Sequence, residues 1–93
     1  MSSNRRQFER LSMQREAIAL NEAGLRLGFV EQVGGGGMSV LLDSGVPTSG
    51  LVAGTQMRIT VVEPLSNIRH TVPVEVRYVT DGVLGLAFAT LAM

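Results

Sequence analysis

The feature that most constrains the fold is a period of two in the apolar side chains of the second half of the chain. In residues 55–63, for example, Met57, Ile59 and Val61 alternate with polar side chains. Because successive side chains of a β-strand point to opposite faces, this period predicts strands that each bury one face. Three such strands are expected, over residues 55–63, 68–79 and 83–89.

Residues with turn chemistry separate these predicted strands. Residues 64–67 begin with Pro64, and residues 80–82 end in an Asp-Gly pair, both of which are typical of turns. Pro73 lies inside the middle strand. Because proline has no backbone N–H, we expect the first half of that strand to be an edge or to carry a bulge. The side chains expected on its apolar face are Val72, Val74, Val76 and Tyr78.

The first half of the chain predicts three shorter strands. They cover residues 14–20, 25–30 and 38–42. Gly24 can take a positive φ and completes a turn that joins the first two strands into a hairpin. In the second strand the apolar alternation is carried by Leu25, Leu27 and Phe29.

The first of these strands has an alternative. Residues 12–23 also suit a helix, because Glu16, Ala17, Leu20 and Ala23 are compatible with one. The turn and the alternating strand that follow favour the strand.

Six short strands, each with one apolar face, predict an all-β domain. An open sheet of such strands would leave unprotected edges, so we expect a small six-stranded antiparallel β-barrel. The 93 residues are enough for one domain. We expect a flexible N-terminal arm over residues 1–13 and the barrel over residues 14–93.

Composition excludes several classes of site. The chain has no cysteine and one histidine, so thiolate nucleophiles, disulfides and multi-histidine metal sites are excluded. His70 is expected to be a surface residue. No arrangement of nucleophile and base supports catalysis, so neither enzyme activity nor a cofactor is expected.

Charge and hydropathy also limit the partners and the location. Eight basic residues, all arginine, balance eight acidic ones, which argues against broad binding to DNA or RNA. No apolar run reaches the roughly 20 residues of a membrane span, and the polar start does not resemble a signal peptide. We therefore expect a soluble cytoplasmic domain without membrane insertion.

The residues expected to carry the function lie at the start of the chain. Arg5, Arg6 and Arg10 fall within six positions. A guanidinium group matches phosphate oxygens two at a time, and its flat face stacks on a base. The cluster indicates an anion or an acidic surface as partner; the alternative is a solvated terminus with scattered charge.

These features together resemble a PilZ domain, the bacterial receptor module for cyclic di-GMP. The family has a small six-stranded barrel, an N-terminal Arg-x-x-x-Arg motif, and an Asp/Asn-x-Ser-x-x-Gly motif at the end of an early strand. Residues 6–10, Arg-Gln-Phe-Glu-Arg, match the first motif, and Arg5 adds the preceding arginine found in many members. Residues 32–37 align with the second motif, and residues 74–88 resemble the family's closing hairpin.

The second motif departs from the family pattern at two positions. Gln32 stands where Asp or Asn is usual, and Gly34 stands where Ser is usual, whereas the final Gly37 is retained. Gln32 keeps an amide but is one methylene longer. Losing the serine hydroxyl removes a polar contact worth about 1 kcal/mol, or roughly fivefold in affinity. The arginine half of the site is intact, and the half that contacts the base is altered.

The resemblance implies a cyclic di-GMP receptor or regulatory domain. The ligand-binding residues that it implies are Arg5, Arg6, Arg10, Gln32, Gly34 and Gly37. Binding would fold the arginine arm onto the barrel and change how the domain meets a protein partner or a larger parent protein. The alternative is a PilZ-like barrel that has lost nucleotide binding and acts as a protein–protein interaction module. A barrel that binds RNA or single-stranded DNA is disfavoured by an aromatic content of 4% and zero net charge.

Overall fold

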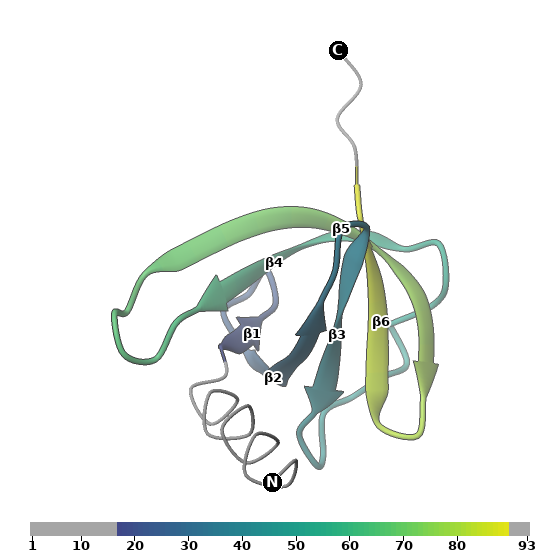
Figure 1. Ribbon diagram of the computed structural model, residues 1–93. Coiled ribbons are helices and arrows are strands. Elements are labelled where there is room, and N and C mark those ends of the chain that lie inside the picture. The colour runs from purple at the N-terminus through teal and green to yellow at the C-terminus, as the bar shows by residue number, and fades with distance from the viewer. Residues whose placement is uncertain (1–16, 90–93) are drawn as a thin grey trace, which may run out of the picture.

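The computed structural model describes residues 17–89, which form six β-strands and no helix. The strands are β1 (Ile18–Leu20), β2 (Arg26–Val33), β3 (Gly37–Leu42), β4 (Gln56–Val62), β5 (Arg69–Thr80) and β6 (Val83–Phe88) (Figure 1). All six predicted strands are present. The alternative helix over residues 12–23 is wrong within the described part of the chain, because residues 18–20 are a strand. The predicted arm over residues 1–13 lies outside the described residues.

The strands close into an antiparallel barrel in the order β1-β2-β3-β6-β5-β4, so the predicted six-stranded barrel is confirmed. The short strand β1 completes the circle, since it pairs with β2 on one side and with β4 on the other. Figure 1 shows β5 arching from β4 across to β6. Residues 69–75 of β5 pair with β4, and residues 74–80 pair with β6.

Pro73 lies where β5 has only one strand beside it. It pairs with Arg58 of β4, whereas the pairing with β6 begins at Val74. The bulge in β5 lies farther along the strand, between Val76 and Tyr78. The prediction of an edge position for the first half of this strand is therefore confirmed, and such a position tolerates a residue without an N–H.

The turn between β1 and β2 forms as its sequence predicts. Gly24 has a φ of +85°. The Oδ1 atom of Asn21 accepts hydrogen bonds from the N–H groups of Ala23 and Leu25, both at 2.9 Å. A short polar side chain thus satisfies the backbone of the turn.

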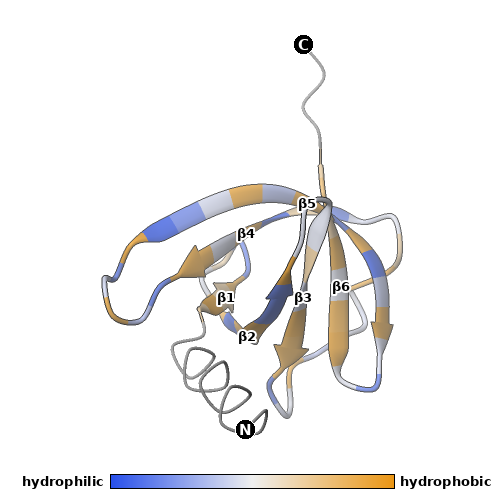
Figure 2. Cartoon of the chain, viewed as in Figure 1, coloured by the Kyte–Doolittle hydropathy of each residue, from blue (hydrophilic) through white to orange (hydrophobic). Residues whose placement is uncertain are grey.

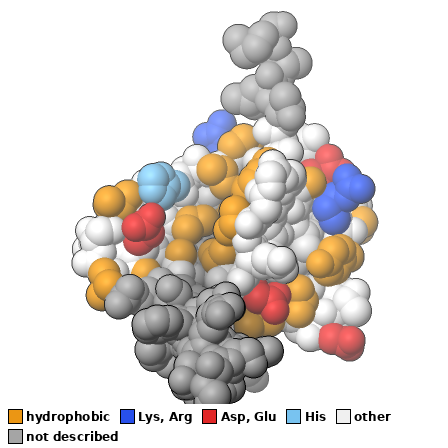
Figure 3. All heavy atoms as spheres, viewed as in Figure 1, with side chains coloured by type: hydrophobic (Ala, Val, Ile, Leu, Met, Phe, Trp, Pro, Cys, Tyr) orange, Lys and Arg blue, Asp and Glu red, His pale blue; other side chains and the backbone are white. Residues whose placement is uncertain are grey.

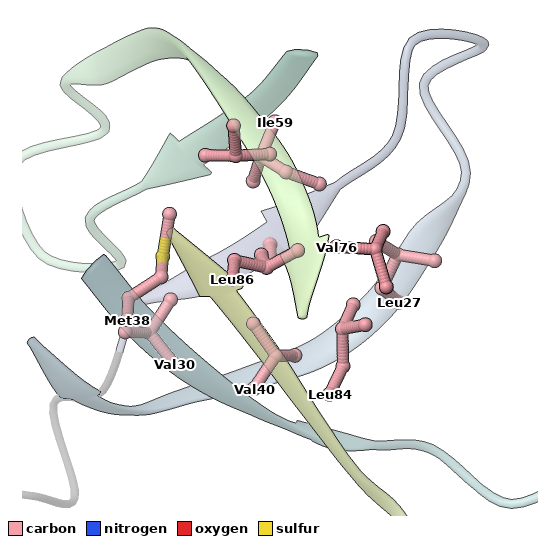
Figure 4. Packing of buried hydrophobic residues seen from close by; sticks show 10 residues of the cluster. Leu27, Val30, Met38, Val40, Ile59, Val76, Leu84 and Leu86 are labelled. Carbon is pink, nitrogen blue, oxygen red and sulfur yellow. The ribbon is translucent and has the colours of Figure 1, made fainter. Parts of the chain in front are cut away.

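Inward-pointing side chains from all six strands form one core. They are Ala19, Leu27, Val30, Met38, Val40, Ile59, Val74, Val76, Leu84 and Leu86. Figure 4 shows the labelled members of this set pointing toward one another inside the barrel, and Figure 2 shows the apolar character of β3 and β6 along most of their length. No polar or charged side chain among residues 17–89 is buried. Each fully buried aliphatic side chain of this core contributes about 1.5–3 kcal/mol.

A bulge in β5 changes which side chains point inward. The register with β6 shifts between Val76 and Tyr78, so Arg77 is an extra residue. After it, Val79 packs against the core, whereas Tyr78 is 49% exposed. The prediction that Tyr78 lies on the apolar face is wrong, because an extra residue reverses the alternation.

A second bulge, in β2, also changes which side chains point inward. Ala19 pairs with Gly28 and Leu20 pairs with Arg26, which leaves Leu27 as the extra residue. Leu27 is buried, but Phe29 is exposed. Leu25, which precedes the strand, is exposed as well. Of the three side chains predicted to form the apolar face of this strand, only Leu27 is buried.

Candidate functional site

A concavity of about 250 Å³ lies on the outer surface of the barrel, where β2, β3, β6 and β5 run side by side. Its walls come from the end of β2, the glycine loop, the start of β3, the second half of β5 and the middle of β6. Gln32, Gly34 and Gly37 all line it. The structure thus brings together the three residues that the second motif supplies.

A bulge at the end of β2 positions Gln32. Val30 pairs with Val40 and Gln32 pairs with Ser39, so Glu31 is the extra residue between them. The Ser39 hydroxyl, which also lines the concavity, donates a hydrogen bond to Oε1 of Glu31 at 3.1 Å. Bulges commonly redirect a side chain at a functional site, and here the bulge brings Gln32 to the rim.

The loop between β2 and β3 consists of three glycines, residues 34–36. It is shorter than the predicted loop, because residues 32 and 33 belong to β2 and Gly37 belongs to β3. Gly34 N–H donates to the Gly37 carbonyl, and the Gly36 carbonyl accepts from Phe88 N–H, both at 2.9 Å. The N–H groups of Gly35 and Gly36 donate to no backbone carbonyl among residues 17–89. Within the described part of the chain, these two donors are left for another acceptor.

The glycines of this run differ in their steric surroundings. A Cβ atom at Gly37 would contact the carbonyl oxygen of Leu86 on the neighbouring strand, so glycine is required for β3 and β6 to pair at their normal distance. A Cβ atom at Gly34, Gly35 or Gly36 would meet no atom within 4 Å, and none of the three has a positive φ. The close approach of Leu86 therefore explains Gly37, whereas neither packing nor backbone conformation explains Gly34.

Tyr78 and Gly85 form the opposite wall. They are cross-strand partners in β5 and β6, and the Tyr78 ring occupies the position where Gly85 would carry a Cβ atom. The ring thus lies flat over the glycine. The bulge at Arg77 places its guanidinium group and the neighbouring ring on the same wall.

The concavity combines several kinds of binding group. Gln32 and Ser39 offer an amide and a hydroxyl inside it, and Gly35 and Gly36 on the loop beside it have N–H groups without a backbone acceptor among residues 17–89. Arg77 forms no ion pair with a carboxylate among residues 17–89, so its charge is available to an anion. The Tyr78 ring offers an apolar face for stacking. This set suits a flat, polar ligand that carries negative charge.

Comparison with known families agrees with this geometry. The model for the PilZ domain matches residues 4–93. The chain belongs to the PilZ domain family. The match includes the arginine motif, all six strands and the concavity, so the predicted resemblance is confirmed. No curated protein and no solved structure matches the chain. The family is one of receptor domains for cyclic di-GMP.

The predicted site residues have different outcomes. Arg5, Arg6 and Arg10 lie outside the described residues, so their place relative to the concavity stays a prediction. The structure adds residues that sequence reasoning missed, namely Ser39, Arg77, Tyr78 and Gly85. The available signal was an arginine and a tyrosine in a strand that pairs with a glycine-containing strand, but the bulge that turns Tyr78 outward has no signature of its own.

A larger hollow of about 540 Å³ lies on the described surface beside Leu25, Asp43 and Leu51, but none of the predicted site residues that the structure describes lines it. Among residues 17–89, no group of three or more His, Cys, Asp or Glu side chains could hold a metal ion. The same residues include no helix long and apolar enough to cross a membrane. On the face shown in Figure 3, the arginine side chains lie apart from one another, and an acidic side chain lies beside the arginine at the right of the view. The His70 side chain is exposed, and its Nε2 atom lies 3.7 Å from Oε2 of Glu63.

Proposed function

We propose that this PilZ domain binds cyclic di-GMP in the concavity between the glycine loop and Tyr78. The observation that supports it is the convergence of Gln32, Gly34 and Gly37 on the same hollow as Arg77 and Tyr78. The motif residues come from β2, the glycine loop and β3, whereas Arg77 and Tyr78 come from β5. A ligand that bridges these strands would meet donors on one side and an aromatic ring on the other.

In this proposal each group has a role that follows from its chemistry. The free N–H groups of the glycine loop and the Arg77 guanidinium contact phosphate oxygens. The Gln32 amide reaches the edge of a guanine, and the Tyr78 ring stacks on its face. Arg6 and Arg10 close over the ligand from the N-terminal arm, and Arg5 adds a further cationic contact.

Closure of the N-terminal arm over the bound nucleotide would make this a regulatory domain, because the surface of the domain would change on binding. The bound nucleotide carries two phosphates, which neutralise the arm's arginines and hold it against the barrel. The surface that the domain offers to a protein partner or to a parent protein then differs between the free and bound states.

Calorimetric titration of cyclic di-GMP into the chain tests the proposal. We expect micromolar binding, and we expect Arg6→Ala and Arg10→Ala each to weaken it by about 10- to 150-fold, the equivalent of about 1.5–3 kcal/mol for a charge-assisted contact. Arg69→Ala is the matched control, because Arg69 is exposed at the start of β5 and does not line the concavity. A folded wild-type chain that takes up no nucleotide would refute the proposal.

A second function is favoured by the altered motif. Gln32 and Gly34 replace the two polar side chains that the family uses at the base, and the structure gives no steric reason for glycine at position 34. A barrel that has lost nucleotide binding and acts as a protein–protein interaction module would retain the fold without them. Absence of nucleotide binding in the titration above would favour this function.

A further inference from the structure

A row of apolar side chains crosses the outside of the barrel next to the concavity. We call it the outer apolar stripe, and it consists of Val62, Ile18, Phe29, Leu41 and Val83. Each member is the direct cross-strand partner of the next, so the stripe crosses β4, β1, β2, β3 and β6 without interruption. None of the five belongs to the core or packs against it from inside.

The stripe has the character of an interaction surface. Phe29 and Leu41 at its centre are 38% and 39% exposed. On one side, Arg26 lies over the Phe29 ring at 4.4 Å and pairs with Asp43 at 2.7 Å. On the other side lies the Glu31 carboxylate, which accepts a hydrogen bond from the Ser39 hydroxyl. A continuous apolar row between charged groups is typical of a surface that another segment covers.

The N-terminal segment of the same chain has matching chemistry. It joins the barrel at Ala17, directly before Ile18 of the stripe, and it carries Phe8 and Leu11. Residues 1–16 contain four arginines and two glutamates, a net charge of +2, and residues 17–93 contain four arginines and six acidic residues, a net charge of −2. The segment and the barrel are therefore complementary in charge as well as in apolar character.

The segment is also long enough. Ile18 and Val83 are three strand positions apart on the stripe, or about 14 Å at about 4.8 Å per strand. The nine residues from Phe8 to Glu16 can span about 30 Å when extended. Phe8 can therefore reach any part of the stripe without movement of the barrel.

We propose that the outer apolar stripe binds residues 8–13 of its own chain, with Phe8 and Leu11 in contact with Phe29 and Leu41. This contact forms without a ligand. The Leu41–Val83 pair is followed two positions along the strands by the Ser39–Gly85 pair, which lines the concavity. A segment bound to the stripe would thus hold Arg10 and the residues before it beside the concavity, a consequence that rests on the proposed function.

Paramagnetic labelling tests the contact directly. The chain has no cysteine, so Ser12→Cys provides a single attachment point for a nitroxide. We expect broadening of the amide NMR signals of Phe29, Leu41 and Val83 without nucleotide. Replacing Phe8 and Leu11 together by serine should abolish the broadening, whereas replacing Gln7 and Gln14 by serine should preserve it.

Two results would overturn the proposal. One is a nitroxide that does not broaden the amide signals of the stripe, or that broadens them equally in the wild type and in the Phe8→Ser/Leu11→Ser variant. The other is broadening that appears only when a spin-labelled chain is mixed with a separate isotope-labelled chain, since that would place a second copy on the stripe.

Nucleotide titration separates this proposal from the proposed function. We expect the Phe8→Ser/Leu11→Ser variant to bind cyclic di-GMP about tenfold more weakly than the wild type, because the arm loses its position. A wild-type chain that shows the broadening but binds no nucleotide would support the contact with the stripe and refute the proposed function alone.

Discussion

Alanine at Gly37 and alanine at Gly34 should change the stability of the barrel in opposite directions. The two glycines are three positions apart in one run and undergo the same chemical change. At Gly37 the added Cβ atom would contact the Leu86 carbonyl oxygen, where β3 pairs with β6. At Gly34 it would meet nothing within 4 Å.

The structure sets the expected magnitudes. Forcing a methyl group between two paired strands is a case of overpacking, which typically costs about 1–3 kcal/mol. For a domain of this size about 1 kcal/mol lowers Tm by about 4–8 °C, so a mid-range cost for Gly37→Ala should lower Tm by about 8–16 °C. Gly34→Ala restricts the unfolded chain without strain in the folded one and should stabilise it by about 0.4–1 kcal/mol, which raises Tm by about 2–8 °C.

Thermal unfolding followed by far-ultraviolet circular dichroism measures both variants against the wild type. Urea unfolding of the same samples checks that the slope of the transition stays constant, so that a shift of the midpoint reports stability. If the two substitutions lower Tm equally, or if Gly37→Ala has no effect, then the close approach of β3 and β6 at Gly37 is not what requires glycine there.

Three further predictions concern the site and the core. The Gln32→Asp/Gly34→Ser double variant, which restores the family motif, should bind cyclic di-GMP at least about fivefold more tightly in calorimetry, and an unchanged or weaker affinity would contradict the assigned role of these positions. Tyr78→Ala should weaken nucleotide binding by about 2- to 13-fold, as expected for the loss of a stacked ring worth about 0.5–1.5 kcal/mol, whereas Tyr78→Phe should retain it; equal losses in both would point to the hydroxyl instead. Ile59→Ala should destabilise the barrel by about 2–5 kcal/mol in urea unfolding, because Ile59 is fully buried, and a loss below about 1 kcal/mol would contradict the central place of Ile59 in the core.

The sequence predicted the strands because the period of two is a local consequence of burying one face of each. It placed Ile59, Val74 and Val76 on apolar faces, and all three are buried. The failures occur after extra residues in strands. A bulge shifts the period by one, and no side chain type marks it unambiguously.

The candidate site was predictable only in part for the same reason. Gln32, Gly34 and Gly37 were found through the family motif, which is continuous in sequence. Arg77 and Tyr78 could not be found in this way, because the pairing of distant strands brings β5 to the concavity and a bulge turns Tyr78 outward. The positions of the N-terminal arginines remain a prediction.

The closure of the barrel depends on a strand of three residues. Ile18, Ala19 and Leu20 are the whole of β1 and pair with both β2 and β4, and the Ala17 carbonyl accepts one further hydrogen bond from Val30 N–H at 2.8 Å. Detachment of this strand would turn the cylinder into an open five-stranded sheet with two unpaired edges, which is the form most prone to associate with other chains. Residue 17 connects β1 directly to the arginine-bearing segment, so any contact that restrains that segment also resists this opening. A molecule that draws the segment away from the barrel pulls on β1 and on its pairing with β2 and β4.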